Sequence, residues 1–136
     1  SIEDTIAFAL KLKEAGVDVI DCSSGGILGS ATAATKTLVP RVPGFQLPFS
    51  ERIRSEAGVM TMAVGLILSG EQAEEALQQG RADLIAVGRD ALYDPNWPLH
   101  AARELGADPE YAMWPQPYGW WLTRRESILR KAGIKR

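Results

Sequence analysis

The chain has 136 residues, of which 46% are hydrophobic and 24% are charged, which is enough apolar material for the core of an ordinary domain. Its net charge of −2 gives no overall attraction to nucleic acid or to an anionic membrane surface. The single cysteine excludes an internal disulfide and a paired-cysteine metal site, and residues 1–20 show no signal-peptide core. We therefore expect a cytoplasmic protein with no membrane span and no bound metal.

The first predicted element is a helix that begins at Ser1, where Ser1 and Asp4 suit a helix N-terminus, and ends before Gly16. Its apolar residues recur at helical spacing, and they are Ile2, Ile6, Ala9, Leu10 and Leu12. A strand is predicted next over residues 17–22, in which apolar residues alternate with aspartate. Cys22, at the carboxyl end of this strand, is expected to be a buried thiol without a chemical role.

The middle of the chain is predicted to contain a long loop, a helix and a strand. Residues 27–48 include several prolines and exceed the length of a simple connection between two elements. A short helix is predicted over residues 49–56. The strand that follows, over residues 59–64, ends in Gly65.

Two helices and one strand are predicted in the next part of the chain. Ser69 is expected to cap a helix over residues 71–79, because a serine hydroxyl accepts hydrogen bonds from the free N–H groups of a first turn. A strand with a continuous apolar run follows over residues 83–87, which is typical of a parallel strand buried on both faces. Another helix is predicted over residues 96–105.

The alternation of strands with helices predicts an α/β fold with parallel strands. A complete (β/α)8 barrel takes about 250 residues, and three strands cannot close one. We therefore predict that residues 1–107 form the C-terminal half of a (β/α)8 (TIM) barrel. Residues 108–136 are predicted to be an aromatic C-terminal tail, ending in a basic, helix-like segment over 122–136, that packs on the barrel or on a neighbouring subunit.

Two of the predicted strands end in a glycine turn, at Gly65-Leu66 and at Gly88-Arg89. A glycine at the carboxyl end of a strand lets an anion approach the main chain, and an arginine beside it offers paired donors to a phosphate. (β/α)8 barrels often build a phosphate site from the loops after their last two strands. The two turns therefore predict a phosphate site. The alternative is a tight strand exit with an arginine on the surface.

Four segments, in the order in which they follow one another, resemble the old yellow enzyme family, and most closely its xenobiotic reductases and thermophilic-type ene-reductases. The segments are 16–26, 43–49, 63–67 and 82–89. Members of this family are FMN-containing barrels that use NADPH or NADH to reduce activated carbon–carbon double bonds of enones and related xenobiotics. The resemblance implies the same fold, cofactors and type of reaction for this protein.

The resemblance also implies roles for individual residues. Gly88 and Arg89 correspond to the pair that binds the FMN phosphate, Gly65 to the glycine of the preceding turn, and the main-chain N–H of Leu66 would be a further donor. Trp121 corresponds to a tail tryptophan that shapes the substrate cavity, in some members that of a neighbouring subunit; an aromatic clamp or a dimer anchor is the alternative. The catalytic side chains of the family belong to the absent N-terminal half, so no catalytic residue is assigned to this chain.

Three functions remain open at this point. The preferred one is the C-terminal part of an FMN-dependent oxidoreductase that has the N-terminal half of its barrel as a partner and forms a homo-oligomer. The second is a phosphate-binding barrel of another chemistry, such as an isomerase or a synthase. The third is a non-catalytic half-barrel that dimerises to bury its open sheet edges. None of the three requires a nucleic-acid or membrane partner.

Overall fold

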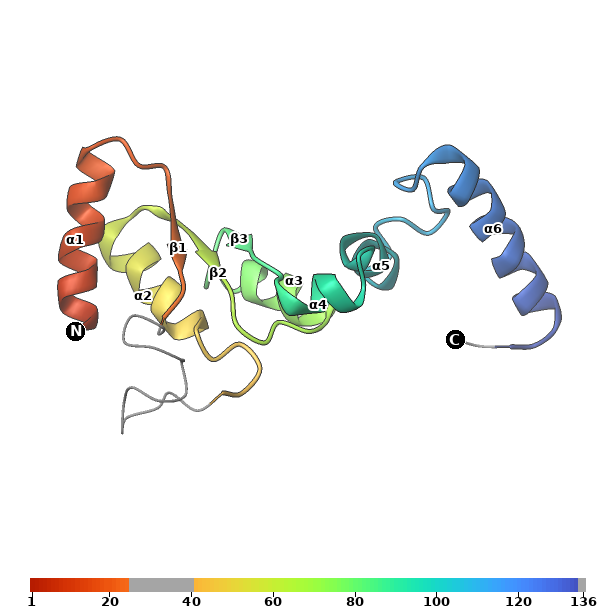
Figure 1. The fold of residues 1–136 in the computed structure, drawn as a ribbon, viewed down its shortest axis with the longest axis horizontal. Helices are drawn as coiled ribbons and strands as arrows, with labels where there is room; N and C mark the ends of the chain where they lie inside the picture. Colours follow the sequence, from red (N-terminus) through yellow and green to blue (C-terminus); the bar gives the residue numbers. More distant parts are fainter. Residues whose placement is uncertain (25–40, 135–136) are drawn as a thin grey trace.

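The computed structural model describes residues 1–24 and 41–134, and in these residues it contains six helices and three strands (Figure 1). The helices are α1 (Ile2–Glu14), α2 (Leu47–Ala57), α3 (Gly70–Gln78), α4 (Arg89–Tyr93), α5 (Trp97–Glu104) and α6 (Gln116–Lys131), and the strands are β1 (Val19–Cys22), β2 (Met60–Ala63) and β3 (Leu84–Ile85). Most of the loop predicted over 27–48 lies outside the described residues. Its last two residues belong to α2, because Pro48 is accommodated in the first turn of a helix.

Helix α1 begins and ends as predicted. The main-chain N–H of Asp4 donates to Ser1 Oγ at 3.3 Å, and the Ser1 amino group donates to the Asp4 carboxylate at 2.9 Å, so the two residues cap the helix reciprocally. Gly16 follows the helix with a φ of +93°, a conformation that favours glycine. The chain then turns directly into β1.

The three strands form one parallel sheet in the order β1-β2-β3. Val19 lies opposite Met60, and Met62 lies opposite Leu84. Each strand is shorter than predicted. Strand β3 lies at the edge of the sheet and pairs with β2 over only two residues. The main-chain N–H of Ala86 still donates to a β2 carbonyl at 2.8 Å before the chain turns away from the sheet.

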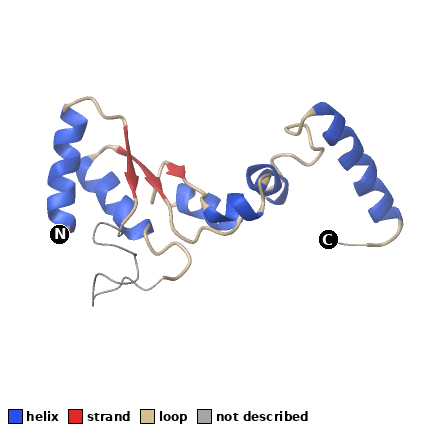
Figure 2. Ribbon diagram, viewed as in Figure 1, coloured by secondary structure: helices blue, strands red, loops and turns tan. Residues whose placement is uncertain are grey.

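Helices α1, α2 and α3 cover one face of the sheet, beside the strands in Figure 2. One buried cluster joins α1, α2 and β1, and it consists of Ile6, Ala9, Cys22, Ile53, Ala57 and Val59. A second cluster joins α2, β2 and α3, and it consists of Leu47, Ala63, Ile67, Ala73, Ala76 and Ala82. Burial of these side chains is the main term that holds the helices to the sheet.

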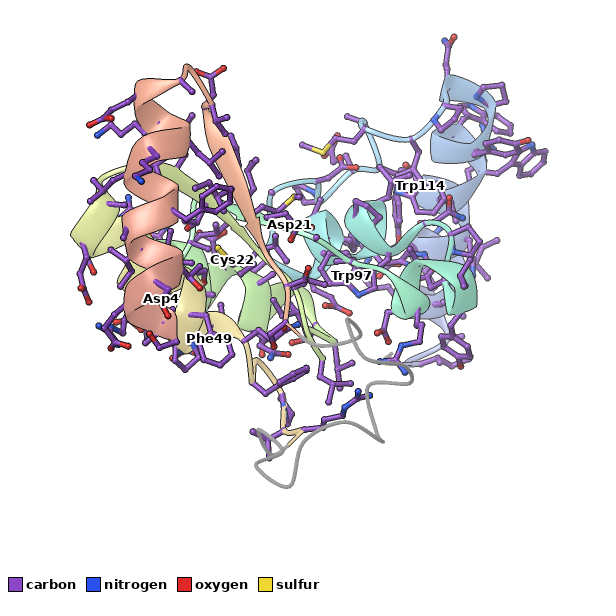
Figure 3. All side chains as sticks on the ribbon, turned by 60° about the vertical axis from the view of Figure 1, so that its left-hand side comes forward. Asp4, Asp21, Cys22, Phe49, Trp97 and Trp114 are labelled. Carbon is purple, nitrogen blue, oxygen red and sulfur yellow. The ribbon has the colours of Figure 1, made fainter. Side chains whose placement is uncertain are left out.

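The opposite face of the sheet remains open in the described chain. Strand side chains alternate between faces, so Asp21, Met60 and Leu84 lie on the side away from the helices. Met60 and Leu84 are each 50% exposed. Figure 3 shows the contrast within β1, where Cys22 lies between the strand and α1 and Asp21 lies on the other side. A face with exposed apolar residues of this kind is suited to packing against further protein.

Two helices differ from the prediction. No helix was predicted over 89–93, because α4 is too short to show a periodic pattern and Gly88 offers no capping side chain. Helix α6 begins at Gln116 rather than at residue 122, so aromatic residues expected in an irregular tail are helical. Pro117 is compatible with this start, since the N–H groups of a first turn have no intrahelical partner.

The first turns of α6 are attached to the segment that precedes them. Gly119 is buried, and a Cβ there would lie 2.5 Å from the carbonyl oxygen of Tyr111, so a larger residue would displace the helix. The Tyr111 hydroxyl donates to Glu126 at 2.9 Å, and Glu126 forms an ion pair with Arg103 of α5 at 3.4 Å. Beyond this attachment, α6 lies at the end of the molecule opposite α1 (Figure 1).

No helix within residues 1–24 and 41–134 is long and apolar enough to cross a bilayer. Helix α6, which has 16 residues, carries Arg124, Arg125, Arg130 and Lys131. In the same ranges no three His, Cys, Asp or Glu side chains gather in an arrangement that could hold a metal ion.

Candidate functional site

The two glycine turns predicted from the sequence line one cavity at the carboxyl ends of β2 and β3. The cavity has a volume of about 180 Å³ and is bounded by residues 64–67 and 86–90. Ligands of parallel α/β folds commonly bind at this edge, because loops of neighbouring strands meet there. The structure therefore brings together four of the residues singled out in the sequence: Gly65, Leu66, Gly88 and Arg89.

The turn after β2 has an unusual backbone. Gly65 has a φ of +118°, and Leu66 has a φ of +51°, which is rare for a residue with a side chain. A Cβ on Gly65 would lie 2.8 Å from Phe45 Cε1 and 2.9 Å from Gln46 Nε2. Glycine is thus required at position 65 by both conformation and space.

The turn after β3 is open on the side of the cavity. A Cβ on Gly88 would meet no atom within 4 Å, so the described chain leaves free space beside this main chain. Arg89 is exposed and has no ion-pair partner among residues 1–24 and 41–134. An unpaired guanidinium next to open main chain is the combination that a phosphate group needs.

The main-chain donors around the cavity are also free. The N–H groups of Leu66, Gly88 and Arg89 donate to no acceptor in the part of the chain that the structure describes. Successive N–H groups in a turn with left-handed residues form a concave anion site. The residues present therefore fit a phosphate group, with main-chain donors supplied by two turns and a cation by Arg89.

Three residues that support the first turn were not identified from the sequence as a group. The Gly44 N–H donates to Gly65 O at 3.0 Å and to Leu66 O at 3.1 Å. Gln46, which is buried, accepts a hydrogen bond from the Ser24 N–H and donates to Val64 O at 3.2 Å. The third residue is Gln72 on α3.

Gln72 could have been noticed from a pattern in the sequence. Ser69 and Gln72 have the spacing of a capping box, in which the glutamine side chain reaches back to the serine main chain. The serine cap is present, since Ser69 Oγ accepts from the Gln72 N–H at 3.2 Å. The glutamine side chain, however, bonds to Leu66 and Leu68 in the turn that lines the cavity.

The structure does not place Trp121 with the other predicted site residues within this chain. Trp121 lies on α6, is 65% exposed, and contacts Trp120 with ring centroids 4.5 Å apart in an edge-on arrangement. It does not line the cavity formed by the two glycine turns. A role at that cavity would require the α6 helix of another subunit.

Cys22 is the buried thiol that the sequence predicts. It is 5% exposed and packs with Ile6 and Ile53. Burial, together with the smaller effect of the neighbouring Asp21 carboxylate, raises the pKa of the Cys22 thiol to about 11. A thiol of this kind is a poor nucleophile at neutral pH.

Comparison with known protein families identifies the larger unit to which this site belongs. The sequence model of the NADH:flavin oxidoreductase / NADH oxidase family matches residues 1–108. The chain belongs to this family. Its fold is α/β, and its three parallel strands with their helices are part of the (β/α)8 barrel of the family, as the sequence predicted. The resemblance to the old yellow enzyme family is confirmed.

Several curated relatives share close to half of their matched residues with this chain. The NADPH dehydrogenase of Geobacillus thermodenitrificans is 46% identical over 110 residues, which are 81% of this chain and 30% of the relative. The NADPH dehydrogenase of Halalkalibacterium halodurans is 50% identical over 105 residues, 77% of this chain and 29% of the relative. That of Bacillus subtilis is 46% identical over 107 residues, 79% of this chain and 30% of the relative. The chain thus spans less than a third of the length of these relatives.

Proposed function

We propose that this chain is the phosphate-binding part of an FMN-dependent, NAD(P)H-using oxidoreductase. The observation that supports this proposal most directly is the cavity at the ends of β2 and β3. There, main-chain N–H groups of two turns and the cation of Arg89 lie together with no partner among residues 1–24 and 41–134. Membership of the NADH:flavin oxidoreductase family supports a flavin as the ligand whose phosphate binds in this cavity. The NADPH dehydrogenase names of the relatives support NADPH as the reductant.

The residues of this chain would bind and orient the cofactor. Arg89 would pair with the FMN phosphate, and the main-chain N–H groups of Leu66 and Gly88 would donate to its oxygens, while Gly65 keeps the turn close to the ligand. FMN, when bound, would supply the redox chemistry, which is transfer of a hydride from NADPH or NADH to one carbon of an activated C=C bond, such as that of an enone, while the other carbon takes up a proton.

The remaining strands of the barrel are the partner that this function requires. The open face of the sheet, with Met60 and Leu84 half exposed, is suited to become the interior of a closed barrel. We define the complete protein as this chain together with the strands that close its barrel. The remaining segment of the Bacillus subtilis relative can supply these strands for an experiment. We expect the catalytic side chains on the part of the barrel that supplies these strands.

Replacing Arg89 tests the phosphate assignment. In the complete protein, Arg89→Ala should weaken FMN binding by roughly ten- to a hundredfold, because a hydrogen bond to a charged group is lost. Riboflavin, which lacks the phosphate, should bind almost unchanged. Fluorescence titration with both flavins measures the two dissociation constants. Arg130→Ala, at an exposed position of α6, is the matched control and should change neither.

Two further outcomes separate the proposal from its alternatives. If the complete protein binds inorganic phosphate but no flavin, the site belongs to a barrel of another chemistry. If the 136-residue chain alone forms a stable dimer on size-exclusion chromatography and does not combine with the remaining strands, it is a self-associating half-barrel. An unchanged FMN dissociation constant for Arg89→Ala would contradict the assignment of the phosphate to Arg89.

A further inference from the structure

We propose that Gln72 is a positioning residue, which orients the main-chain N–H groups of Leu66 and Ile67 toward the bound phosphate. The inference rests on the proposed function, since it concerns the same cavity, but Gln72 itself does not line that cavity. The side chain would act through the turn after β2 without touching the ligand.

Both halves of the Gln72 side-chain amide bond to the main chain of this turn. Nε2 donates to Leu66 O at 3.0 Å, and Oε1 accepts from the Leu68 N–H at 2.9 Å. The other glutamines nearby make no comparable contact among the described residues, since the side chains of Gln78 in α3 and of Gln79 after it each donate to a glutamate one helical turn earlier. Gln72 therefore connects the first turn of α3 with the wall of the cavity.

Three consecutive carbonyl groups of the turn are held by donors. Val64 O accepts from Gln46, Gly65 O accepts from Gly44, and Leu66 O accepts from Gly44 and Gln72. A trans peptide unit is planar, so its N–H points opposite to its carbonyl. The N–H groups of Gly65, Leu66 and Ile67 therefore point away from these donors.

Two consecutive N–H groups of this turn have the properties of an anion site. The N–H groups of Leu66 and Ile67 donate to no acceptor within residues 1–24 and 41–134, and both residues line the cavity. Adjacent N–H groups held in this way can donate to one phosphate. The Ile67 N–H shares its peptide unit with the Leu66 carbonyl, so its direction depends directly on that carbonyl, and the direction of the neighbouring Leu66 N–H relative to it depends on the conformation of Leu66.

The conformation of Leu66 needs such a restraint. Its φ of +51° lies in the left-handed region, which a leucine occupies only where its surroundings hold it there. The Gly44 N–H is shared between two carbonyl oxygens, at 3.0 and 3.1 Å, which weakens each bond. Among the described residues, Gln72 is the one unshared donor to Leu66 O.

The test is the discrimination between FMN and riboflavin in the complete protein. Gln72→Leu removes both hydrogen bonds at nearly constant volume and should weaken FMN binding about tenfold, as expected when one charge-assisted contact is lost. Riboflavin binding should change less than about twofold, because its isoalloxazine ring does not depend on the phosphate turn. Gln72→Asn, whose shorter amide cannot span both bonds, should act in the same direction if the leucine variant folds poorly.

Two controls separate positioning from a loss of local stability. Ser69→Ala removes the cap of α3 and should lower stability while leaving the ratio of the FMN and riboflavin dissociation constants unchanged. Gln78→Leu changes an exposed glutamine of the same helix and should alter neither flavin. Equal weakening of both flavins in Gln72→Leu, or weakening of neither, would overturn the inference.

A phosphate titration keeps the inference testable without FMN. The amide resonances of Leu66 and Ile67 should shift with inorganic phosphate in the wild-type complete protein and shift much less in Gln72→Leu. The same response in both proteins would show that Gln72 does not orient these groups. Failure of the wild-type protein to bind FMN would contradict the proposed function, whereas this comparison would still decide the role of Gln72.

Discussion

At the scale of single residues, the two glycines of the site are required for different reasons. Gly65 has a positive φ and no room for a Cβ, so its requirement comes from the described chain itself. Gly88 has open space where its Cβ would be, so no neighbouring atom in the described chain excludes a side chain there. A ligand close to this main chain supplies a physical reason for the second glycine.

The sequence indicated residues that line the cavity but not those that hold them in place. Gly65, Gly88 and Arg89 follow apolar strands, and their position at strand ends is visible in a one-dimensional pattern. Gly44 and Gln72 act through hydrogen bonds to a turn formed by other residues. Such contacts depend on the packing of α2, α3 and β2 together, which no local pattern encodes.

The raised pKa of Cys22 leads to a prediction about its reactivity. With a pKa of about 11, the thiolate fraction at pH 8 is far below that of an unfolded cysteine, and alkylation should be about a hundredfold slower in the folded protein. The rate should keep rising with pH until about pH 11, because deprotonation of the folded thiol continues to that point. Mass spectrometry of the Cys22 peptide after iodoacetamide treatment, in native buffer and in urea, measures both rates.

Rapid labelling of folded Cys22 at pH 8 would contradict its burial against α1 and α2. The pKa also affects stability, because the folded state retains the thiol proton at pH values where the unfolded chain has lost it. The contribution of Cys22 to stability should therefore be constant below about pH 8 and fall as the pH rises above this value.

At the scale of elements, helices with clear terminal signals were predicted best. The helix after Ser69 was expected over 71–79 and is found at Gly70–Gln78, because a capping serine and a terminal glycine both mark its ends. The predicted strands are too long, because the apolar sequence continues beyond the last paired residues at the edge of the sheet. The α4 helix has five residues and was missed for lack of any periodic signal.

The amino ends of the strands, opposite the candidate site, are joined by Asp83. Its two carboxylate oxygens share the Arg54 Nε–H, each at 3.0 Å, and one of them also accepts from the Thr61 N–H at 2.9 Å. Arg54 also donates to Gly80 O at 3.2 Å. This one carboxylate thus connects α2, β2 and the chain that enters β3.

Replacing Asp83 should therefore lower stability without affecting cofactor binding. Asp83→Asn is expected to reduce the free energy of unfolding by about 1–2 kcal/mol, mostly from the hydrogen bond to Thr61, since the partly exposed ion pair with Arg54 is screened by solvent. Urea unfolding of the complete protein measures the change. Asp18→Asn, at an exposed position, is the control and should change it by less than about 0.5 kcal/mol. A loss of FMN affinity in Asp83→Asn would contradict the separation of the two ends of the sheet.

At the scale of the whole molecule, the described chain has two surfaces that are suited to further protein. The open face of the sheet exposes Met60 and Leu84, and helix α6 exposes Tyr118, Trp120 and Trp121. The open sheet face is expected for part of a barrel, because the helices of these three strands cover only one side of the sheet. The second lies beyond residue 108, where the match to the family ends. Large exposed aromatic residues are favoured at interfaces and in pockets.

The exposed Trp121 on helix α6 is suited to reach a neighbouring subunit. Helix α6 lies at the end of the molecule opposite α1 in Figure 1, and Trp121 does not line the phosphate cavity of its own chain. We therefore expect Trp121 to shape a substrate cavity of a neighbouring subunit. In the complete protein, Trp121→Ala should change the KM or the selectivity between small and bulky enones several-fold, while the FMN content stays the same. Tyr118→Ala is the control, since Tyr118 is 64% exposed and Trp121 65% exposed on the same helix. Unaltered kinetics for cyclohexenone and a bulky enone in Trp121→Ala would reduce this tryptophan to a structural contact.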